Sequence, residues 1–338
     1  MGLTCALFFP ATVLSGEAID TKAAEFLNAL SGEQREDIGW IFEDAERTDI
    51  HYAPISLDGV RHDMLDESQT RLAEALLTEI LSKRGYQKVT SIRLLERDIR
   101  EMESRVFGLF GLRDPGRYFW AFFGGPAKAK PWGFRFEGHH LSLNITAIPG
   151  HPLSTTPLFL GAQPREVPEG LPSAGVAALG DEEQLARTLY RSFDDKQQIT
   201  ATLPYVDGRG HMIGQVRRVS SPEPIGLARS QMTSRQKALL DELLDLFAGL
   251  WNAETAAARR HDIAEALDEI YFAFVESNEP PNAFYMRVAG PGLLIEIDNT
   301  EGGDHVHAVW HDPASDFGND LLTQHWEESH GTSIATFD

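Results

Sequence analysis

The chain has 338 residues, and its 30 lysines and arginines against 51 aspartates and glutamates give a formal net charge of −21. A surface this acidic repels phosphate backbones and anionic membranes, so nucleic acid and membrane partners are disfavoured and cations are favoured. The one cysteine, Cys5, excludes an intramolecular disulfide and thiolate metal sites of the CxxC kind. Any metal ion must therefore be held by imidazole, carboxylate, amide or water.

The first 18 residues contain a short apolar run (LTCALFFPATVL), which Pro10 interrupts and which lacks the basic start of a signal peptide. We expect it to be an extended segment packed on the body of the protein. Since no stretch approaches the roughly 20 apolar residues that span a membrane, we expect a cytoplasmic protein.

Apolar residues recur at helical spacing through the first third of the chain, where Ser31 has the type and position of a helix cap and Gly85 those of a helix end. From Tyr118 onward, short aromatic and branched runs separated by Gly and Pro indicate antiparallel strands. A Pro- and Gly-rich loop at 164–177 is the best candidate for a domain boundary or lid. We expect helices at 23–30, 32–45, 69–84 and 90–106, and strands at 118–123, 132–136, 141–148 and 157–161.

The second half of the chain repeats this order of helices followed by strands. We expect helices at 182–192, 233–250 (capped by Thr233) and 254–274, strands at 283–288, 293–298 and 305–310, and a closing helix at 319–328. This pattern predicts an α+β fold with a single domain, in which helices flank one composite, mostly antiparallel sheet and the two strand clusters lie side by side. We expect this domain, residues 1–338, to consist of four parts. A helical part covers about 19–107, a sheet part covers 117–163 and 283–311, a connecting helical part covers 181–276, and a closing helix covers 318–330.

Five of the twelve histidines fall between His305 and His330, which is the main chemical signal of the sequence. Side chains alternate along a strand, so Glu296 and Asp298 share one face, and His305 and His307 share a face of the returning strand. If the apolar residues of both strands face one core, these four groups meet on the other side. Imidazole with carboxylate suits Zn, Fe, Mn or Cu better than Mg or Ca. The competing interpretation is a solvated polar strand face.

The adjacent pair His139 and His140 forms the second half of the predicted site. Neighbouring residues on a regular strand point to opposite faces, although Gly138 can support a bulge that turns one of them. Asn144 shares the phase of His140, which favours His140 as a metal ligand and Asn144 as a substrate contact. We expect His139 to be a proton-transfer group, with a buried histidine bonded to a carbonyl as the alternative.

Three further residues complete the predicted site. His325 lies on the expected closing helix and faces the body of the protein rather than solvent, so it can be a ligand, a supporting residue or a general base. Asn299 can orient a carboxylate or contact substrate, and Arg135 is a candidate anion clamp, with pairing at the surface as its alternative. We expect His311 and His330 to be exposed and outside the site.

Several of these segments resemble the DUF3500 family, a protein family of unknown function. The resemblance starts at the FLNAL helix at 26–30 and rests on residues 132–144 (WGFRFEGHHLSLN), 157–164 (PLFLGAQP), 296–299 (EIDN), 305–307 (HVH), 312–322 (DPASDFGNDLL) and His325. It implies one domain over nearly the whole chain and implies no activity. Some relatives carry export signals, and this chain shows none.

Three classes of function fit a histidine- and carboxylate-rich, thiol-free site. The leading one is an oxidoreductase that uses mononuclear iron or copper to activate dioxygen, with His140, Glu296, His305 and His307 as ligands and His139, His325 and Asp298 in catalysis. A zinc-dependent hydrolase is the second, and manganese is a further option for the metal. The third is a protein that binds a metal or ligand without catalysis, or a metal-free hydrogen-bonded cluster. We expect a small-molecule or peptide substrate, and no pattern indicates the oligomeric state.

Overall fold

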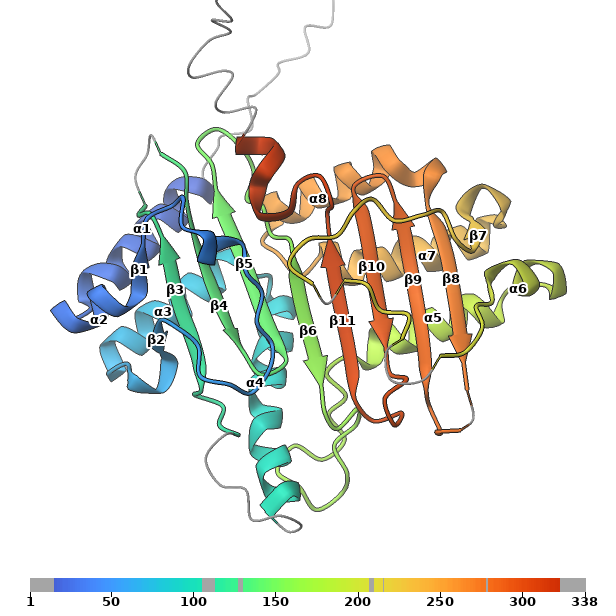
Figure 1. The fold of residues 1–338 in the computed structure, drawn as a ribbon, viewed down its shortest axis with the longest axis horizontal. Helices are drawn as coiled ribbons and strands as arrows, with labels where there is room; N and C mark the ends of the chain where they lie inside the picture. Colours follow the sequence, from blue (N-terminus) through green and yellow to red (C-terminus); the bar gives the residue numbers. More distant parts are fainter. Residues whose placement is uncertain are drawn as a thin grey trace, which may run out of the picture.

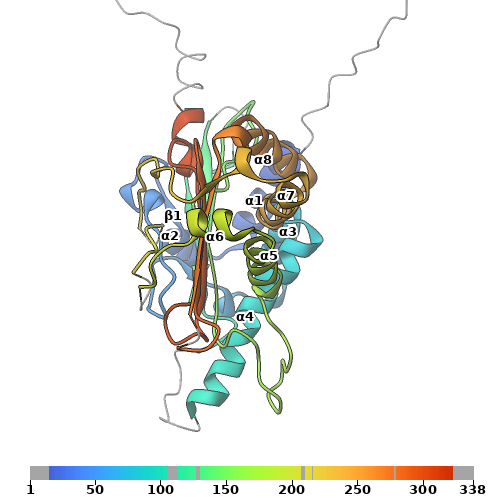
Figure 2. The same cartoon turned by 90° about the vertical axis from the view of Figure 1, so that its right-hand side faces the viewer.

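The computed structural model describes residues 15–104, 113–126, 130–206, 210–214, 216–277 and 279–322. In this part of the chain one twisted sheet runs through the whole molecule, with most helices on one face and long loops on the other (Figures 1 and 2). The predicted α+β fold with a mostly antiparallel sheet is confirmed.

The helices begin at capping residues that the sequence makes visible. Ser31, Asp66, Asp194 and Thr233 each accept a hydrogen bond from the backbone three residues on, with a glutamine closing the capping box. The described helices are α1 (Ser15–Ala29), α2 (Gly32–Ile38), α3 (Glu67–Ile80), α4 (Lys83–Ser104), α5 (Gly180–Arg191), α6 (Asp195–Ala201), α7 (Ser234–Ala248) and α8 (Ala253–Ala266).

Two meanders of four strands each form the centre of the sheet, and they meet where β6 pairs antiparallel with β11. Short strands extend both edges, and β1 is parallel to β3. The described strands are β1 (Gly39–Trp40), β2 (Val60–Arg61), β3 (Tyr118–Phe123), β4 (Trp132–Gly138), β5 (Leu141–Ala147), β6 (Leu158–Ala162), β7 (Leu227–Ala228), β8 (Tyr271–Glu276), β9 (Phe284–Gly290), β10 (Leu293–Asp298) and β11 (Val306–His311). The two predicted strand clusters therefore do lie side by side.

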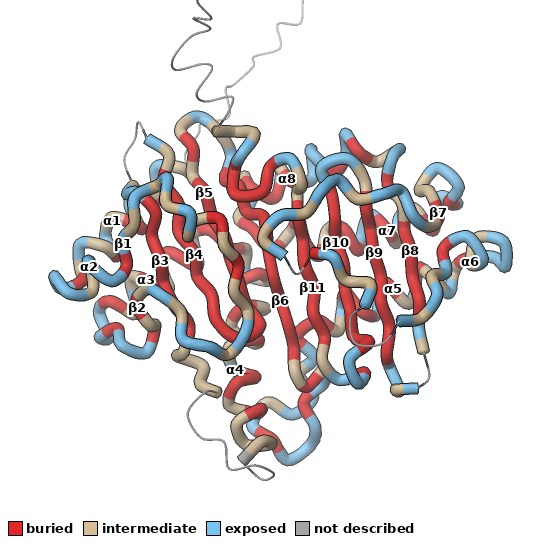
Figure 3. The backbone as a smooth tube through the Cα atoms, viewed as in Figure 1, coloured by how far each residue is buried: buried red, intermediate tan, exposed pale blue. Residues whose placement is uncertain are grey.

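The two faces of the sheet differ in chemistry, as strand alternation requires. On the helix side, residues such as Ile295 and Ile297 of β10 and Val306 of β11 join the main hydrophobic core. Polar side chains face the other way, and two loops, one before β2 and one before β7, cross over them (Figures 1 and 2). Because these loops cover the polar face, its strands are buried on both sides (Figure 3).

Three predicted elements differ from the structure. The predicted helix at 32–45 ends at Ile38, because Gly39 is extended and begins the short strand β1, which pairs with β3. Gly85 does not end a helix but lies in the first turn of α4, where its N–H donates to the hydroxyl of Ser82. A glycine is needed there because the backbone of Leu250 packs against it: a Cβ at Gly85 would lie 2.0 Å from the carbonyl oxygen of Leu250. The predicted helix at 254–274 ends at Ala266, and its last part is strand β8. There Phe272 and Phe274 alternate into the core, a period of two that the preceding helical pattern concealed.

Other expectations concern the ends of the chain and the connecting loop. Residues 1–14 of the predicted extended segment lie outside the described part of the chain. Its last four residues belong to helix α1, which begins at Ser15. Most of the predicted closing helix, including His325 and His330, also lies outside the described part. The loop at 164–177 packs on α4, where Ser173 donates its N–H to Asp98. Every helix in the described part of the chain is too short or too polar to span a bilayer.

Candidate metal centre

Three histidine side chains meet at the seam between the two meanders. Nε2 of His305 lies 2.7 Å from Nε2 of His140 and 3.0 Å from Nε2 of His307. His140 and His307 are 2% exposed, and the side chain of His305 is 20% exposed. The fold thus brings the predicted ligands from two distant segments into one cluster that touches solvent at His305.

The position of His140 depends on a strained turn. Gly138 pairs with Leu141, so His139 and His140 form a two-residue connection between β4 and β5. His140 has a φ of 64°, in the left-handed region that non-glycine residues rarely adopt, at a cost on the order of 1–3 kcal/mol. Its N–H bonds the carbonyl of Tyr52 at 2.9 Å, and its own carbonyl accepts from Gly161 at 2.7 Å. These bonds hold the turn in the conformation that aims the ring at β11.

A glycine on β6 makes the space that this ring needs. A Cβ at Gly161 would lie 2.7 Å from Cδ2 and 2.8 Å from Cγ of His140. Gly161 also pairs with His307 across the β6–β11 ladder. A side chain at Gly161 would therefore displace one predicted ligand directly beside another.

The turn from β10 to β11 positions His305. The side-chain oxygen of Asn299 accepts the N–H of His305 at 3.0 Å, and its amide donates to the carbonyls of Asn282 and Gly303. The carboxylate of Glu301 lies 3.5 Å from Nδ1 of His305, which favours a proton on Nδ1 and leaves Nε2 facing the other two rings. The structure thus places Asn299, a predicted substrate contact, in the support of a ligand.

The electrostatics of the cluster favour a neutral imidazole at His140. Burial, followed by the positive charges that neighbouring rings would carry, holds the pKa of His140 well below its usual value. Neutral imidazole is the form that binds metal ions. A metal ion can bind all three Nε2 atoms, whereas without one the single lone pair on Nε2 of His305 can accept a hydrogen bond from Nε2 of either His140 or His307. These are the two arrangements that the geometry allows.

Glu296 does not join the histidines, because the register of β10 and β11 places it opposite Val309. Its carboxylate accepts the hydroxyl of Tyr285 at 2.5 Å and the N–H of Gly214 at 2.6 Å. The predicted role of Glu296 as a metal ligand is therefore not supported by the geometry. Its actual contacts tie the loop before β7 to the sheet.

Asp298 lies directly opposite His307 and is fully buried on the same face. One carboxylate oxygen accepts the N–H of Thr300 at 2.9 Å and its hydroxyl at 2.8 Å. Asp298 therefore lies beside one ligand and also shapes the turn toward His305. Its predicted role as a catalytic base stays a prediction.

His139 is stacked on His140, with ring centroids 3.7 Å apart and an angle of 27° between the planes. Its Nδ1 is in close contact with the carboxylate of Glu96 from α4, and Arg113 lies 2.9 Å from the same nitrogen. His139, Glu96 and His140 also form a group with metal-ligand spacing. Because the guanidinium of Arg113 already provides a cation there, a second metal ion is disfavoured.

The side chains of Arg135 and Asn144 are buried and bonded to other parts of the protein, so neither is open to a substrate. Arg135 is 1% exposed, so neither surface pairing nor an anion clamp fits it. Its guanidinium lies 2.6 Å from Glu137 and 2.5 Å from Glu46, and it donates to the carbonyl of Asp49 at 3.1 Å. The amide of Asn144 donates to Ser142 and Pro157 on its own part of the sheet.

His311, which the sequence led us to expect at the surface, is fully buried on β11. Its Nδ1 lies 2.5 Å from the carboxylate of Asp316 and its Nε2 lies 2.8 Å from the carbonyl of Gly214. Both partners can accept a hydrogen bond, so this environment favours the form of His311 with a proton on each nitrogen. Burial alone would lower the pKa of His311, but the hydrogen bond to Asp316, the charge of that carboxylate, the carbonyl of Gly214 and the charge of Glu296 together outweigh burial and raise the pKa.

Sequence reasoning missed three supporting residues for different reasons. Glu96 looks like an ordinary polar position of a helix, and only the packing of α4 brings it to His139. Gly161 interrupts an apolar strand, a signal of close backbone approach that could have been used. Tyr52, whose ring stacks on Phe159 at 4.0 Å and meets the edge of His307, lies in a loop without a motif.

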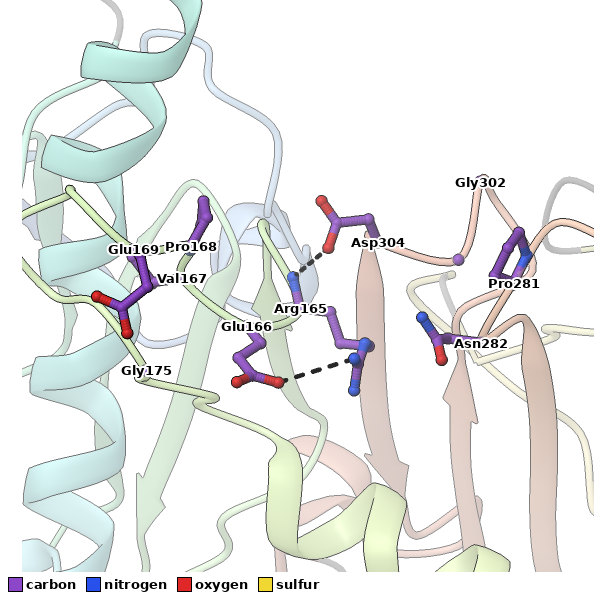
Figure 4. Close-up of a pocket in the computed structure, with 11 residues that line it drawn as sticks. Arg165, Glu166, Val167, Pro168, Glu169, Gly175, Pro281, Asn282, Gly302 and Asp304 are labelled. Carbon is purple, nitrogen blue, oxygen red and sulfur yellow. Dashed lines mark hydrogen bonds and ion pairs between the residues drawn. The ribbon is translucent and has the colours of Figure 1, made fainter.

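A cavity of about 460 Å³ opens at the end of the sheet where the central strand β11 begins. Asp304, the residue before His305, lines it, and its carboxylate accepts the N–H of Arg165 at 3.0 Å (Figure 4). The other lining residues shown there include Glu166, Glu169 and Asn282. None of the three histidines lines this cavity.

Comparison with known proteins gives one match. The family model described as "Protein of unknown function (DUF3500)" matches residues 14–319. Neither the curated proteins nor the solved structures contain a match to the chain.

Proposed function

The chain belongs to the DUF3500 family, and we propose that it is a metal-dependent enzyme whose metal ion binds to His140, His305 and His307. The observation that carries the proposal is the convergence of three Nε2 atoms, with separations of 2.7 and 3.0 Å. Three protein ligands leave positions for water or substrate, which is the arrangement of a catalytic rather than a structural site.

The charge of the ligands favours activation of water. Three neutral imidazoles leave the full charge of a divalent ion on the centre, and this is a ligand set that catalytic zinc uses to lower the pKa of bound water to about 7. No carboxylate among the described residues joins the three histidines in a group with ligand spacing. The two-histidine, one-carboxylate set of many iron oxygenases is thus not supported, and zinc-dependent hydrolysis becomes the first candidate.

Oxidoreductase chemistry with iron or copper is the second candidate, and the angles between the ligands favour it. With metal–nitrogen bonds of about 2.0–2.1 Å, the observed separations correspond to angles of roughly 80–95° at the metal, whereas a tetrahedral ion needs about 3.3 Å between nitrogens. Small side-chain rotations close this difference at less than about 1 kcal/mol. Binding of a structural zinc ion contributes on the order of 10 kcal/mol, which is far more than these rotations cost. The angles therefore weigh less than the charge of the ligands, and zinc stays the first candidate.

Access to the centre is expected on the side of His305, the most exposed of the three ligands. The neighbouring cavity at Asp304 is large enough for a small molecule or the end of a peptide. Its acidic lining, together with the net charge of −21, favours neutral or cationic substrates.

Elemental analysis of the purified protein tests this function. We expect about one transition-metal ion per chain in the wild type and a loss of at least ten-fold in His307→Ala. The surface histidine variant His261→Ala is the matched control and should keep its metal. Zinc with activity that does not need oxygen supports the hydrolase, and iron or copper supports the oxidoreductase. Metal content that is unchanged in His307→Ala would overturn the proposed site.

A further inference from the structure

A cluster of charged residues, Glu96, Arg113 and Glu103, lies behind His140, and Glu96 and Arg113 contact the ring of His139. Glu96 is 1% exposed, and its carboxylate is in close contact with Nδ1 of His139. Burying a carboxylate costs free energy unless a partner compensates it. A helix that only had to pack on the β4–β5 turn would not need a carboxylate at this position.

The geometry points to a positioning role for Glu96. We propose that Glu96 fixes the ring of His139, and that the ring of His139 in turn fixes the ring of His140 for metal binding. This proposal rests on the metal site proposed above. It extends that site from the face where His307 meets Tyr52 and Phe159 to helix α4. Helix α4 belongs to the helical layer beside the sheet (Figure 2).

Each step of this series, from Glu96 to His139 and from His139 to His140, corresponds to a contact in the structure. Tyr118 donates its hydroxyl to the carbonyl of His139 at 2.8 Å, which fixes the backbone of the turn. Glu96 and Arg113 hold the ring of His139, and Glu103 holds Arg113 at 2.8 Å. The ring of His139 is stacked on that of His140 at 3.7 Å, so rotation of one ring is limited by the other.

The backbone of His140 is fixed by two hydrogen bonds, while its ring lies between the stack with His139 on one side and the rings of His305 and His307 on the other. Its N–H and carbonyl are bonded to Tyr52 and Gly161, but a ring in a left-handed turn can still rotate about its side-chain bonds. Supporting residues that fix such a rotation typically contribute 10–100-fold to metal affinity.

A double-mutant cycle tests the proposal, with cobalt(II) as the metal probe and its visible absorption as the signal. We expect Glu96→Gln to weaken cobalt binding about 10–100-fold and to change the spectrum of the bound ion. His139→Phe keeps an aromatic ring on His140 but removes the link to Glu96, so we expect a similar loss. If Glu96 acts through His139, the double variant is no weaker than the single variants, because their effects are not additive.

Asp98→Asn is the matched control. Asp98 is a fully buried acid on the same helix, but it accepts from Ser173 and does not contact the turn. We expect it to change the melting temperature while its cobalt affinity stays within about two-fold of wild type. Glu96→Gln with unchanged affinity and spectrum would overturn the positioning role while leaving the metal site intact. A wild type that does not bind cobalt would overturn the metal site and the positioning role together.

Discussion

At the scale of single residues, the site depends on a histidine in a strained turn and a glycine that makes room for it. The identity of His140, His305 and His307 as ligands could be proposed from strand alternation, because HxH at the start of β11 places both rings on one face. The separation of Glu296 from the histidines could not be predicted from alternation, because it depends on the register of β10 against β11. A shift of two residues along a strand leaves a side chain on the same face but about 7 Å away.

Gly161 gives a prediction at this scale. In Gly161→Ala the new methyl group would overlap the ring of His140, so we expect metal affinity to fall at least ten-fold and stability to fall by about 1–3 kcal/mol. Gly125→Ala, where nothing lies within 4 Å of the added carbon, serves as the control. Calorimetric metal titration measures the affinity; equal affinities of the two variants would show that the ring does not need this space.

At the scale of elements, buried polar side chains of the sheet attach the two covering loops, one through an ion pair and the other through hydrogen bonds. Arg135 on β4 holds the loop that contains Glu46 and Asp49, and this loop continues to Tyr52 beside the histidines. The sequence identified Arg135 as notable but could not show its partner, because the loop lies about 90 residues away in the chain. Only the folded sheet brings them together.

Replacing Arg135 alone leaves the carboxylate of Glu137 buried without its partner. We therefore expect Arg135→Met to cost about 3–5 kcal/mol of unfolding free energy. The double variant Arg135→Met/Glu137→Leu should cost less than this single variant, since an apolar pair leaves no buried charge. Denaturant unfolding measures both values, and a double variant that is the less stable of the two would contradict this account of the ion pair.

The loop before β7 is attached in a way that depends on pH. His311 donates to Gly214 of this loop and to Asp316, and its folded-state pKa is raised. A raised pKa means that the stabilisation is complete below the unfolded value near 6.5 and is lost as the pH rises through the folded value. Other charged groups at this point are Glu296, Arg287 and Asp312.

We expect His311→Gln to be less stable than wild type by about 1–2 kcal/mol at pH 6, with the difference shrinking as the pH rises toward 9. Unfolding curves of both proteins across this range measure it. A difference that is constant or grows with pH would show that His311 is neutral in the folded protein.

At the scale of the whole molecule, the proposed centre lies on the β6–β11 seam and links the two halves of the sheet. The sequence predicted both meanders and their adjacency, because each has its own alternating strands and turns. It did not predict β8, whose residues follow a helix without a clear break, or the loops over the polar face, whose backbone carries no periodic signal.

A ligand that joins the two halves should stabilise the fold as a whole. At a free metal concentration of a thousand times the dissociation constant, binding adds about 4 kcal/mol, which for a chain of this length is roughly 6 °C in melting temperature. Differential scanning calorimetry of metal-loaded and chelator-treated protein measures this shift. His307→Ala should melt at the same temperature with and without metal.

The most direct measurement is a crystal structure with anomalous diffraction collected at the absorption edge of the bound metal. The account predicts one anomalous peak about 2.0–2.2 Å from Nε2 of His140, His305 and His307, with at least one further position held by water. A peak at other residues, or metal-soaked crystals in which the three rings bond only to one another, would contradict it.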